Sequence, residues 1–166
     1  MNTSSEISSY NFYKQYHQHP TNKAIHFICI PMIIFSIFNY LSIIKPNIQL
    51  VNNYYINRFL NKHLTYITLN TFYFIYYTLY MNLIVAFAMS VYFFYLYLFS
   101  FIFVHLNKNW IIDTTYIFIF SWVLQFIGHY IEGSRPALTD SLSQAFLEAP
   151  VFSLDYLSLF SRLLKN

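Results

Sequence analysis

The sequence has very little charge and almost no glycine. Charged residues make up 9% of the 166 residues and there are only two glycines, while 57% are hydrophobic and 23% are aromatic. A soluble domain of this length needs far more polar surface. The composition therefore predicts an integral membrane protein of the all-α class, embedded in a lipid bilayer.

Runs of basic residues and pairs of cysteines are also missing. The net charge of +3 comes from nine scattered Lys and Arg residues against six acidic ones, as expected beside membrane helices. Nothing in this pattern predicts nucleic-acid binding. Cys29 is the single cysteine, so an internal disulfide and a multi-cysteine metal centre are excluded. Its simplest interpretation is a small buried residue; a ligand role beside His26 is the weaker alternative.

The apolar stretches are long enough to cross a bilayer, which takes about 20 apolar residues per helix. They cover residues 24–44, 64–80, 83–106 and 114–131. A single helix over residues 64–106 would be about 64 Å long, against a hydrocarbon core of ~30 Å, so we expect a turn at residues 80–82. The sequence thus predicts one domain, residues 1–166, with about four transmembrane helices, and its longest loop over residues 45–62.

Amphipathic segments flank these stretches. Residues 10–18 alternate between tyrosine or phenylalanine and polar residues, which is typical of a helix at the membrane interface. Near the other end, apolar residues follow helical spacing from Leu138, and Pro150 interrupts them. We therefore predict an N-terminal interfacial helix and an interfacial or re-entrant segment over residues 138–160.

Histidines cluster just before the first apolar stretch. His17 and His19 precede Pro20, and His26 follows it by six residues. Proline suits the first position of a helix because it has no N–H to donate and its φ is already helical. His26 then lies in the second helical turn, where His17 can fold back over it.

An even number of spans places both chain ends on one side of the membrane. His129, at the exit of the last span, then returns to the side of the N-terminal histidines, together with Glu132 three residues later. His63 and His105 fall on the opposite side, ~30 Å away. A histidine at a helix end is often only an interfacial hydrogen-bonding residue, and that alternative stays open for each one. Polar residues at membrane depth are costly and usually functional, so the group as a whole favours a metal site.

Several distinctive motifs stand at both ends of the sequence. They are YKQYHQHPTNKAIH at 13–26, Pro31, QFIGH at 125–129, RPAL at 135–138, Asp140, Gln144, and Ala149 with Pro150. Together these motifs resemble the membrane family of fungal 2-hydroxy fatty acid dioxygenases and their plant and bacterial relatives. Residues 45–112 match only in being hydrophobic.

The resemblance implies an Fe(II)-dependent enzyme of the endoplasmic reticulum membrane. It would use O2 to remove one carbon from a 2-hydroxy fatty acid during α-oxidation, a step in phytosphingosine degradation. On this basis we predict His17, His26 and His129 as metal ligands, with His19 and Glu132 as candidates for a fourth. His19 stands where many fungal relatives have Asn.

Arg135 lies just outside the last span. It is a candidate for pairing with the substrate carboxylate through two hydrogen bonds, and contact with lipid headgroups is the alternative. Two other function classes also remain open. One is a haem-binding electron carrier that uses a pair of histidines, and the other is a non-catalytic membrane protein.

Overall fold

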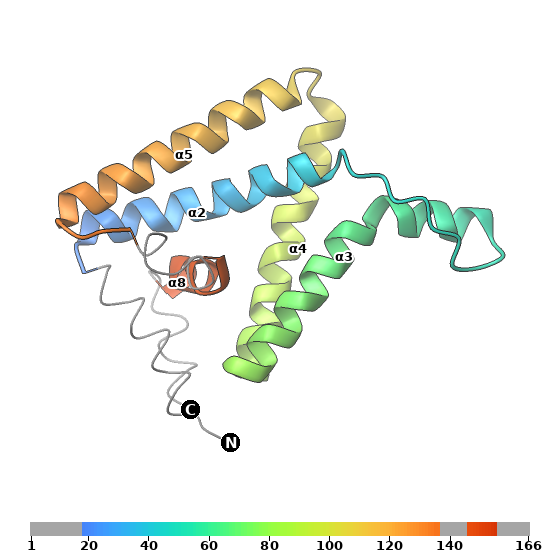
Figure 1. The fold of residues 1–166 in the computed structure, drawn as a ribbon, viewed down its shortest axis with the longest axis horizontal. Helices are drawn as coiled ribbons and strands as arrows, with labels where there is room; N and C mark the ends of the chain where they lie inside the picture. Colours follow the sequence, from blue (N-terminus) through green and yellow to red (C-terminus); the bar gives the residue numbers. More distant parts are fainter. Residues whose placement is uncertain (1–17, 137–145, 156–166) are drawn as a thin grey trace.

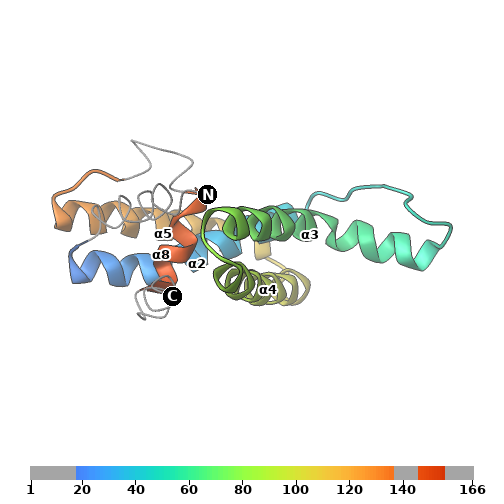
Figure 2. The same ribbon diagram turned by 90° about the horizontal axis from the view of Figure 1, so that it is seen from below.

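The computed structural model describes residues 18–136 and 146–155, which form helices and no strands. The helices are α2 (Pro20–Leu41), α3 (Tyr54–Tyr80), α4 (Leu83–Leu106), α5 (Trp110–Glu132) and α8 (Ala149–Asp155). Figure 1 shows α2 and α5 side by side and antiparallel, with α3 and α4 as a second pair that runs at a wide angle to them. Figure 2 shows α8 where the two pairs meet. The predicted all-α membrane class is confirmed.

Asparagine side chains cap the two helices of the second pair. The Oδ1 of Asn53 accepts hydrogen bonds from the backbone N–H groups of Tyr55 and Ile56, at 2.9 and 3.1 Å. Asn82 caps α4 in the same way, through a 2.9 Å bond from the N–H of Val85. Asparagine is a preferred residue at this position because its side chain replaces a missing helical acceptor. The predicted turn between residues 80 and 82 is therefore confirmed, and the residue that marks it in the sequence is Asn82, the N-cap of α4.

Helix α3 begins at Tyr54, so the predicted loop over residues 45–62 is wrong in its second half. Capping by Asn53 allows the helix to start before the apolar stretch does. Three helices, α2, α4 and α5, are long and apolar enough to cross a membrane. The first turns of α3 carry Arg58 and Lys62, and its passage through the membrane as a fourth span stays a prediction.

Small and polar residues join α2 to α5. Near one end of this contact, the Nδ2 of Asn39 donates a 2.9 Å hydrogen bond to the Oγ1 of Thr114. Near the other end, Gly128 lies directly against the side chain of Asn22. Membrane helices gain little from hydrophobic exclusion, so close packing and polar bonds of this kind hold them together.

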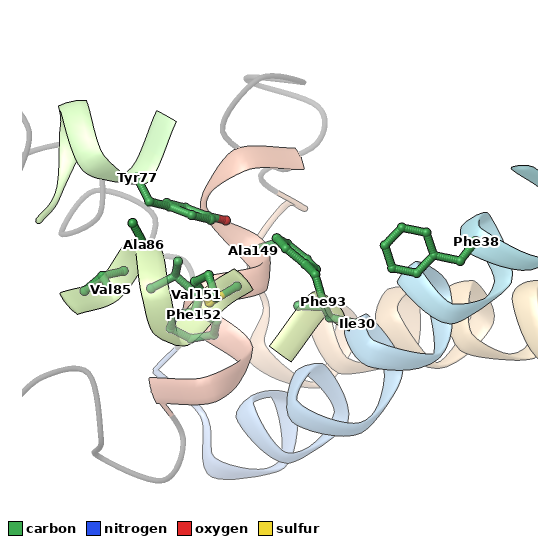
Figure 3. Close-up of a cluster of buried hydrophobic side chains, with 10 residues drawn as sticks. Ile30, Phe38, Tyr77, Val85, Ala86, Phe93, Ala149, Val151 and Phe152 are labelled. Carbon is green, nitrogen blue, oxygen red and sulfur yellow. The ribbon is translucent and has the colours of Figure 1, made fainter. Parts of the chain in front are cut away.

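Helix α8 packs against the body of the protein. Its residues Ala149, Val151 and Phe152 are buried together with Tyr77 of α3 and Val85 of α4, as Figure 3 shows. The remaining part of the predicted interfacial or re-entrant segment, and the N-terminal interfacial helix up to residue 17, lie outside the described residues.

Three tyrosine hydroxyl groups of α3 hold the turn before α8. They donate hydrogen bonds to three consecutive residues: Tyr73 to the carbonyl of Phe146 (3.1 Å), Tyr77 to the carbonyl of Leu147 (2.8 Å) and Tyr76 to Oε1 of Glu148 (2.8 Å). Burial raises the pKa of Glu148, and the bond from Tyr76 lowers it in part. Burial thus favours the neutral carboxyl group at this contact.

Candidate metal and substrate site

Two of the predicted ligands, His26 of α2 and His129 of α5, meet in the structure. Their ring centres are 5.0 Å apart and their planes are nearly perpendicular, at 88°. Both side chains are buried, with 2% and 6% of their surface exposed. Because an imidazole nitrogen binds a metal at about 2.1 Å, rings this close can ligate the same ion.

A backbone contact fixes the orientation and the proton of the His26 ring. Its Nδ1 lies 2.9 Å from the carbonyl oxygen of Asn22. A carbonyl oxygen only accepts hydrogen bonds, so Nδ1 carries the proton and the neutral ring has its lone pair on Nε2. Metal-binding histidines commonly donate their second ring N–H to such an acceptor. His26 therefore fits a ligand that binds through Nε2.

Glu132 ties the start of α2 to the end of α5. Its carboxylate accepts hydrogen bonds from the backbone N–H of His19, at 3.0 Å, from the N–H of Gln18 and from the Nδ2 of Asn22. A carboxylate is stabilised at a helix N-terminus by the unpaired N–H groups there. These bonds give Glu132 a positioning role, because they hold Asn22, whose carbonyl in turn orients His26. A direct ligand role for Glu132 stays a prediction.

The structure places two of the other predicted site residues, His19 and Arg135, at the protein surface. His19 is exposed, and its Nδ1 caps α2 by accepting a 3.2 Å hydrogen bond from the N–H of Thr21. Arg135 is exposed beside Pro136. Among the described residues, no group of three or more His, Cys, Asp or Glu side chains could hold a metal. His17, the predicted third ligand, lies outside those residues.

An apolar cavity of about 260 Å³ extends from the two histidines. Residues of α2, α3, α4 and α5 form most of its wall, and Phe146, Ala149 and Pro150 form another part. Apart from the two histidines, Gln125, Asn70 and Tyr73, the wall is mostly hydrocarbon, with Ile30, Ile33, Ile34, Ile37, Phe38, Leu69 and Phe93. Such a space suits an acyl chain, because apolar walls exclude water and leave its methylene groups without polar neighbours.

Sequence analysis missed Gln125 as a site residue. It stands one helical turn before His129, lines the same cavity and is 7% exposed. Its Nε2 is buried and has no hydrogen-bond partner in the described part of the chain. A buried amide without a partner is costly and calls for an explanation, and a polar group on a bound molecule supplies one. The signal in the sequence was a polar residue in an apolar span at a spacing of four from His129.

His63 and His105 lie apart from the His26–His129 pair, as the sequence predicts. Both pack against the ring of Phe101, and the Nδ1 of His105 donates a 2.7 Å hydrogen bond to the carbonyl of the same residue. Neither lines the apolar cavity. Cys29 is buried, which agrees with its simplest interpretation.

Two buried imidazoles beside an apolar cavity define a membrane protein with a polar site next to a space that suits a hydrocarbon chain. The chain belongs to the family of 2-hydroxy-palmitic acid dioxygenase Mpo1-like proteins, whose model matches residues 3–160. This family is one of oxidoreductases, which confirms the predicted family and enzyme class.

A similar relative is the 2-hydroxy-palmitic acid dioxygenase MPO1 of Saccharomyces cerevisiae. The two chains are 28% identical over 159 residues, an alignment that covers 87% of this chain and 75% of the yeast protein. No solved structure matches the chain.

Proposed function

We propose that this protein is an Fe(II)-dependent dioxygenase that uses O2 to remove one carbon from 2-hydroxy fatty acids. The observation that carries this proposal is the buried pair of His26 and His129 at the end of an apolar cavity. The family supports the reaction class and the 2-hydroxy acid substrate. We further propose that the enzyme acts in the endoplasmic reticulum membrane, in the α-oxidation that degrades phytosphingosine.

The reaction balances without an added reductant. The bond between C1 and C2 of the substrate breaks, C2 becomes the carboxyl carbon of the shortened acid, and C1 leaves as carbon dioxide. One O2 accepts the four electrons released, and the two remaining hydrogens leave as water. A bound Fe(II) ion would be able to bind the 2-hydroxy acid and O2 at the same time, and it would be able to change its oxidation state.

The residues of the chain supply binding, orientation and exclusion of water. His26, through Nε2, and His129 are the proposed ligands within the described structure, and His17 is the proposed third ligand. The substrate head lies beside these rings while its acyl chain fills the cavity lined by α2 and α3. The amide of Gln125 then donates a hydrogen bond to the carboxylate or the 2-hydroxyl group. Arg135 remains a second candidate for the carboxylate, since it lies beside Pro136 of the cavity wall.

Replacing Gln125 by Leu is expected to weaken substrate binding while leaving the metal in place. A hydrogen bond to a charged group contributes about 1.5–3 kcal/mol, so kcat/KM should fall roughly 10- to 100-fold. Steady-state turnover and iron content measured on the same preparation test this. Ser121→Ala is the matched control, because Ser121 is buried one turn earlier on α5 and bonds only the carbonyl of Ile117 in the described structure. If both changes lowered kcat/KM equally, the result would show that Gln125 does not contact the substrate.

Removal of the metal tests the proposed function itself. We expect the purified protein to contain about one iron per chain, chelation to abolish turnover, and Fe(II) to restore it. Zinc should restore nothing, because Zn²⁺ has no redox chemistry. Conversion of 2-hydroxypalmitic acid to the acid one carbon shorter is the readout. Full recovery of turnover with zinc alone, or unchanged turnover after complete chelation, would contradict the dioxygenase proposal.

A further inference from the structure

A second cavity, which we call the basic cavity, lies at the other end of α2 from His26. Its volume is about 1070 Å³, and it is bounded by the end of α2, residues 43–53, the first turns of α3 and the last turns of α4. Lys45, Arg58, Lys62 and His105 line it, and its described wall contains no Asp or Glu. This wall therefore presents cationic groups to any occupant, with no carboxylate to neutralise them.

Two asparagines of α3 hold the outer wall of the basic cavity in place. Asn57 accepts hydrogen bonds from the N–H groups of Leu50 and Val51, each at 3.1 Å, and donates one of 2.7 Å to the carbonyl of Val51. Asn61, one turn later, bonds both the N–H and the carbonyl of Ile48 at 3.0 Å. The amide groups thus replace the partners that a neighbouring strand would offer. These hydrogen bonds therefore hold the segment over residues 47–51 in a defined position as a wall of the cavity.

The same turns of α3 place its cationic residues. Arg58 and Lys62 each follow one of the asparagines by one residue, and their spacing of four puts them on one helix face. The Nζ of Lys62 lies 4.4 Å from the ring centre of Phe101 on α4, a cation–π contact that orients this side chain. Lys45 joins them from the start of the connecting segment. Cations from two separate segments therefore face one space.

Part of the wall of the basic cavity is apolar. It includes Phe38 and Leu41 of α2, Val104 of α4 and Trp110 at the start of α5. A small inorganic anion would need only the cationic wall, whereas a molecule with an anionic head and hydrocarbon chains matches both walls. Basic cavities between membrane helices bind the phosphate groups of anionic lipids in this manner.

We infer that the basic cavity binds the phosphate headgroup of an anionic membrane lipid, with part of an acyl chain against its apolar wall. Arg58, Lys62 and Lys45 contact the phosphate, and Arg58 can do so through two N–H groups at once. This site lies at the far end of α2 from the two histidines, and it does not depend on the proposed dioxygenase function.

Lipid binding to the full chain in neutral detergent micelles tests the inference. Phosphatidic acid and phosphatidylcholine with the same acyl chains are titrated, and bound lipid is counted by native mass spectrometry. The triple variant Lys45→Gln, Arg58→Gln, Lys62→Gln is expected to bind phosphatidic acid roughly a hundredfold more weakly, at about fivefold for each lost cation. Phosphatidylcholine should bind far more weakly than phosphatidic acid to the unchanged protein.

Lys108→Gln is the matched control, since Lys108 is exposed in the connection between α4 and α5, outside the basic cavity. It removes one charge near the same end of the helices and should weaken binding by less than about twofold at physiological salt. An equal loss in Lys108→Gln and in the single variant Arg58→Gln would overturn the inference. The single variants Arg58→Gln and Lys62→Gln also replace the triple variant if that protein does not purify.

Inorganic phosphate and glycerol 3-phosphate separate the two possible sources of the phosphate group. Neither should displace phosphatidic acid at matched concentrations, because neither contacts the apolar wall. If either competes as well as the lipid does, the ligand is a soluble phosphate and the lipid assignment is wrong. Turnover of a 2-hydroxy fatty acid should be unchanged in Arg58→Gln, which keeps this test distinct from that of the dioxygenase site.

Discussion

Replacement of His26 or His129 by Ala is expected to abolish the conversion of 2-hydroxypalmitic acid to the acid one carbon shorter. Each change removes one of the two buried rings whose centres lie 5.0 Å apart. Loss of a partner that merely orients a metal ligand costs about 10- to 100-fold in affinity or activity, so loss of a ligand should cost at least a hundredfold. Iron content per chain, measured together with turnover, should fall in parallel.

Two other histidines serve as controls for this experiment. His105→Ala should leave turnover and iron content unchanged, because His105 is an exposed residue that packs on Phe101, away from the apolar cavity. His19→Asn should also be tolerated, since Asn supplies an equally good cap for α2. If His19→Asn lost as much iron as His26→Ala, His19 would be a true ligand. Equal damage by His105→Ala would contradict the placement of the site.

Replacement of Gly128 by Ala is expected to disturb both stability and the site. A Cβ atom at this position would overlap the Oδ1 of Asn22 and would lie 3.3 Å from the Cδ1 of Ile25. Asn22 is fully buried and bonds Glu132, and its carbonyl orients His26. Either Asn22 moves, which breaks its bond to Glu132, or α5 shifts away from α2. Overpacking of this kind costs about 1–3 kcal/mol.

Thermal unfolding in detergent and turnover measure the effect of Gly128→Ala. The matched test repeats the change in an Asn22→Ala background, where the atom nearest to the new Cβ is gone. The added cost should then be much smaller than in the unchanged protein, giving a coupling between the two positions of at least about 1 kcal/mol. Purely additive losses would show that the clash with Asn22 is not the cause. Gly128→Ala should also lower turnover by displacing His129, its neighbour in the chain.

The sequence alone was sufficient for the class of the protein and for the pairing of two histidines. A bilayer permits few solutions for a chain this apolar, so composition leads directly to membrane helices. The turn at Asn82 followed from the limited length of a spanning helix. His26 and His129 could be paired because each stands within two turns of a helix end, and the predicted even number of passes places these two ends on one side of the membrane. These inferences rest on local composition and on the number of membrane spans, and neither requires knowledge of side-chain packing.

Contacts between distant segments were decided only in the tertiary structure. Residues 54–62 are polar enough to be read as a loop, yet Asn53 caps a helix there, and Asn57 and Asn61 bond residues 48–51. The approach of Gly128 to Asn22 depends on how α2 and α5 pack, and the bonds of Glu132 to the start of α2 join residues 110 or more positions apart. Gln125 is recognised as a site residue only because the tertiary structure places it in the wall of the apolar cavity. Each of these contacts depends on the relative positions of helices, which hydrophobic periodicity along one helix does not specify.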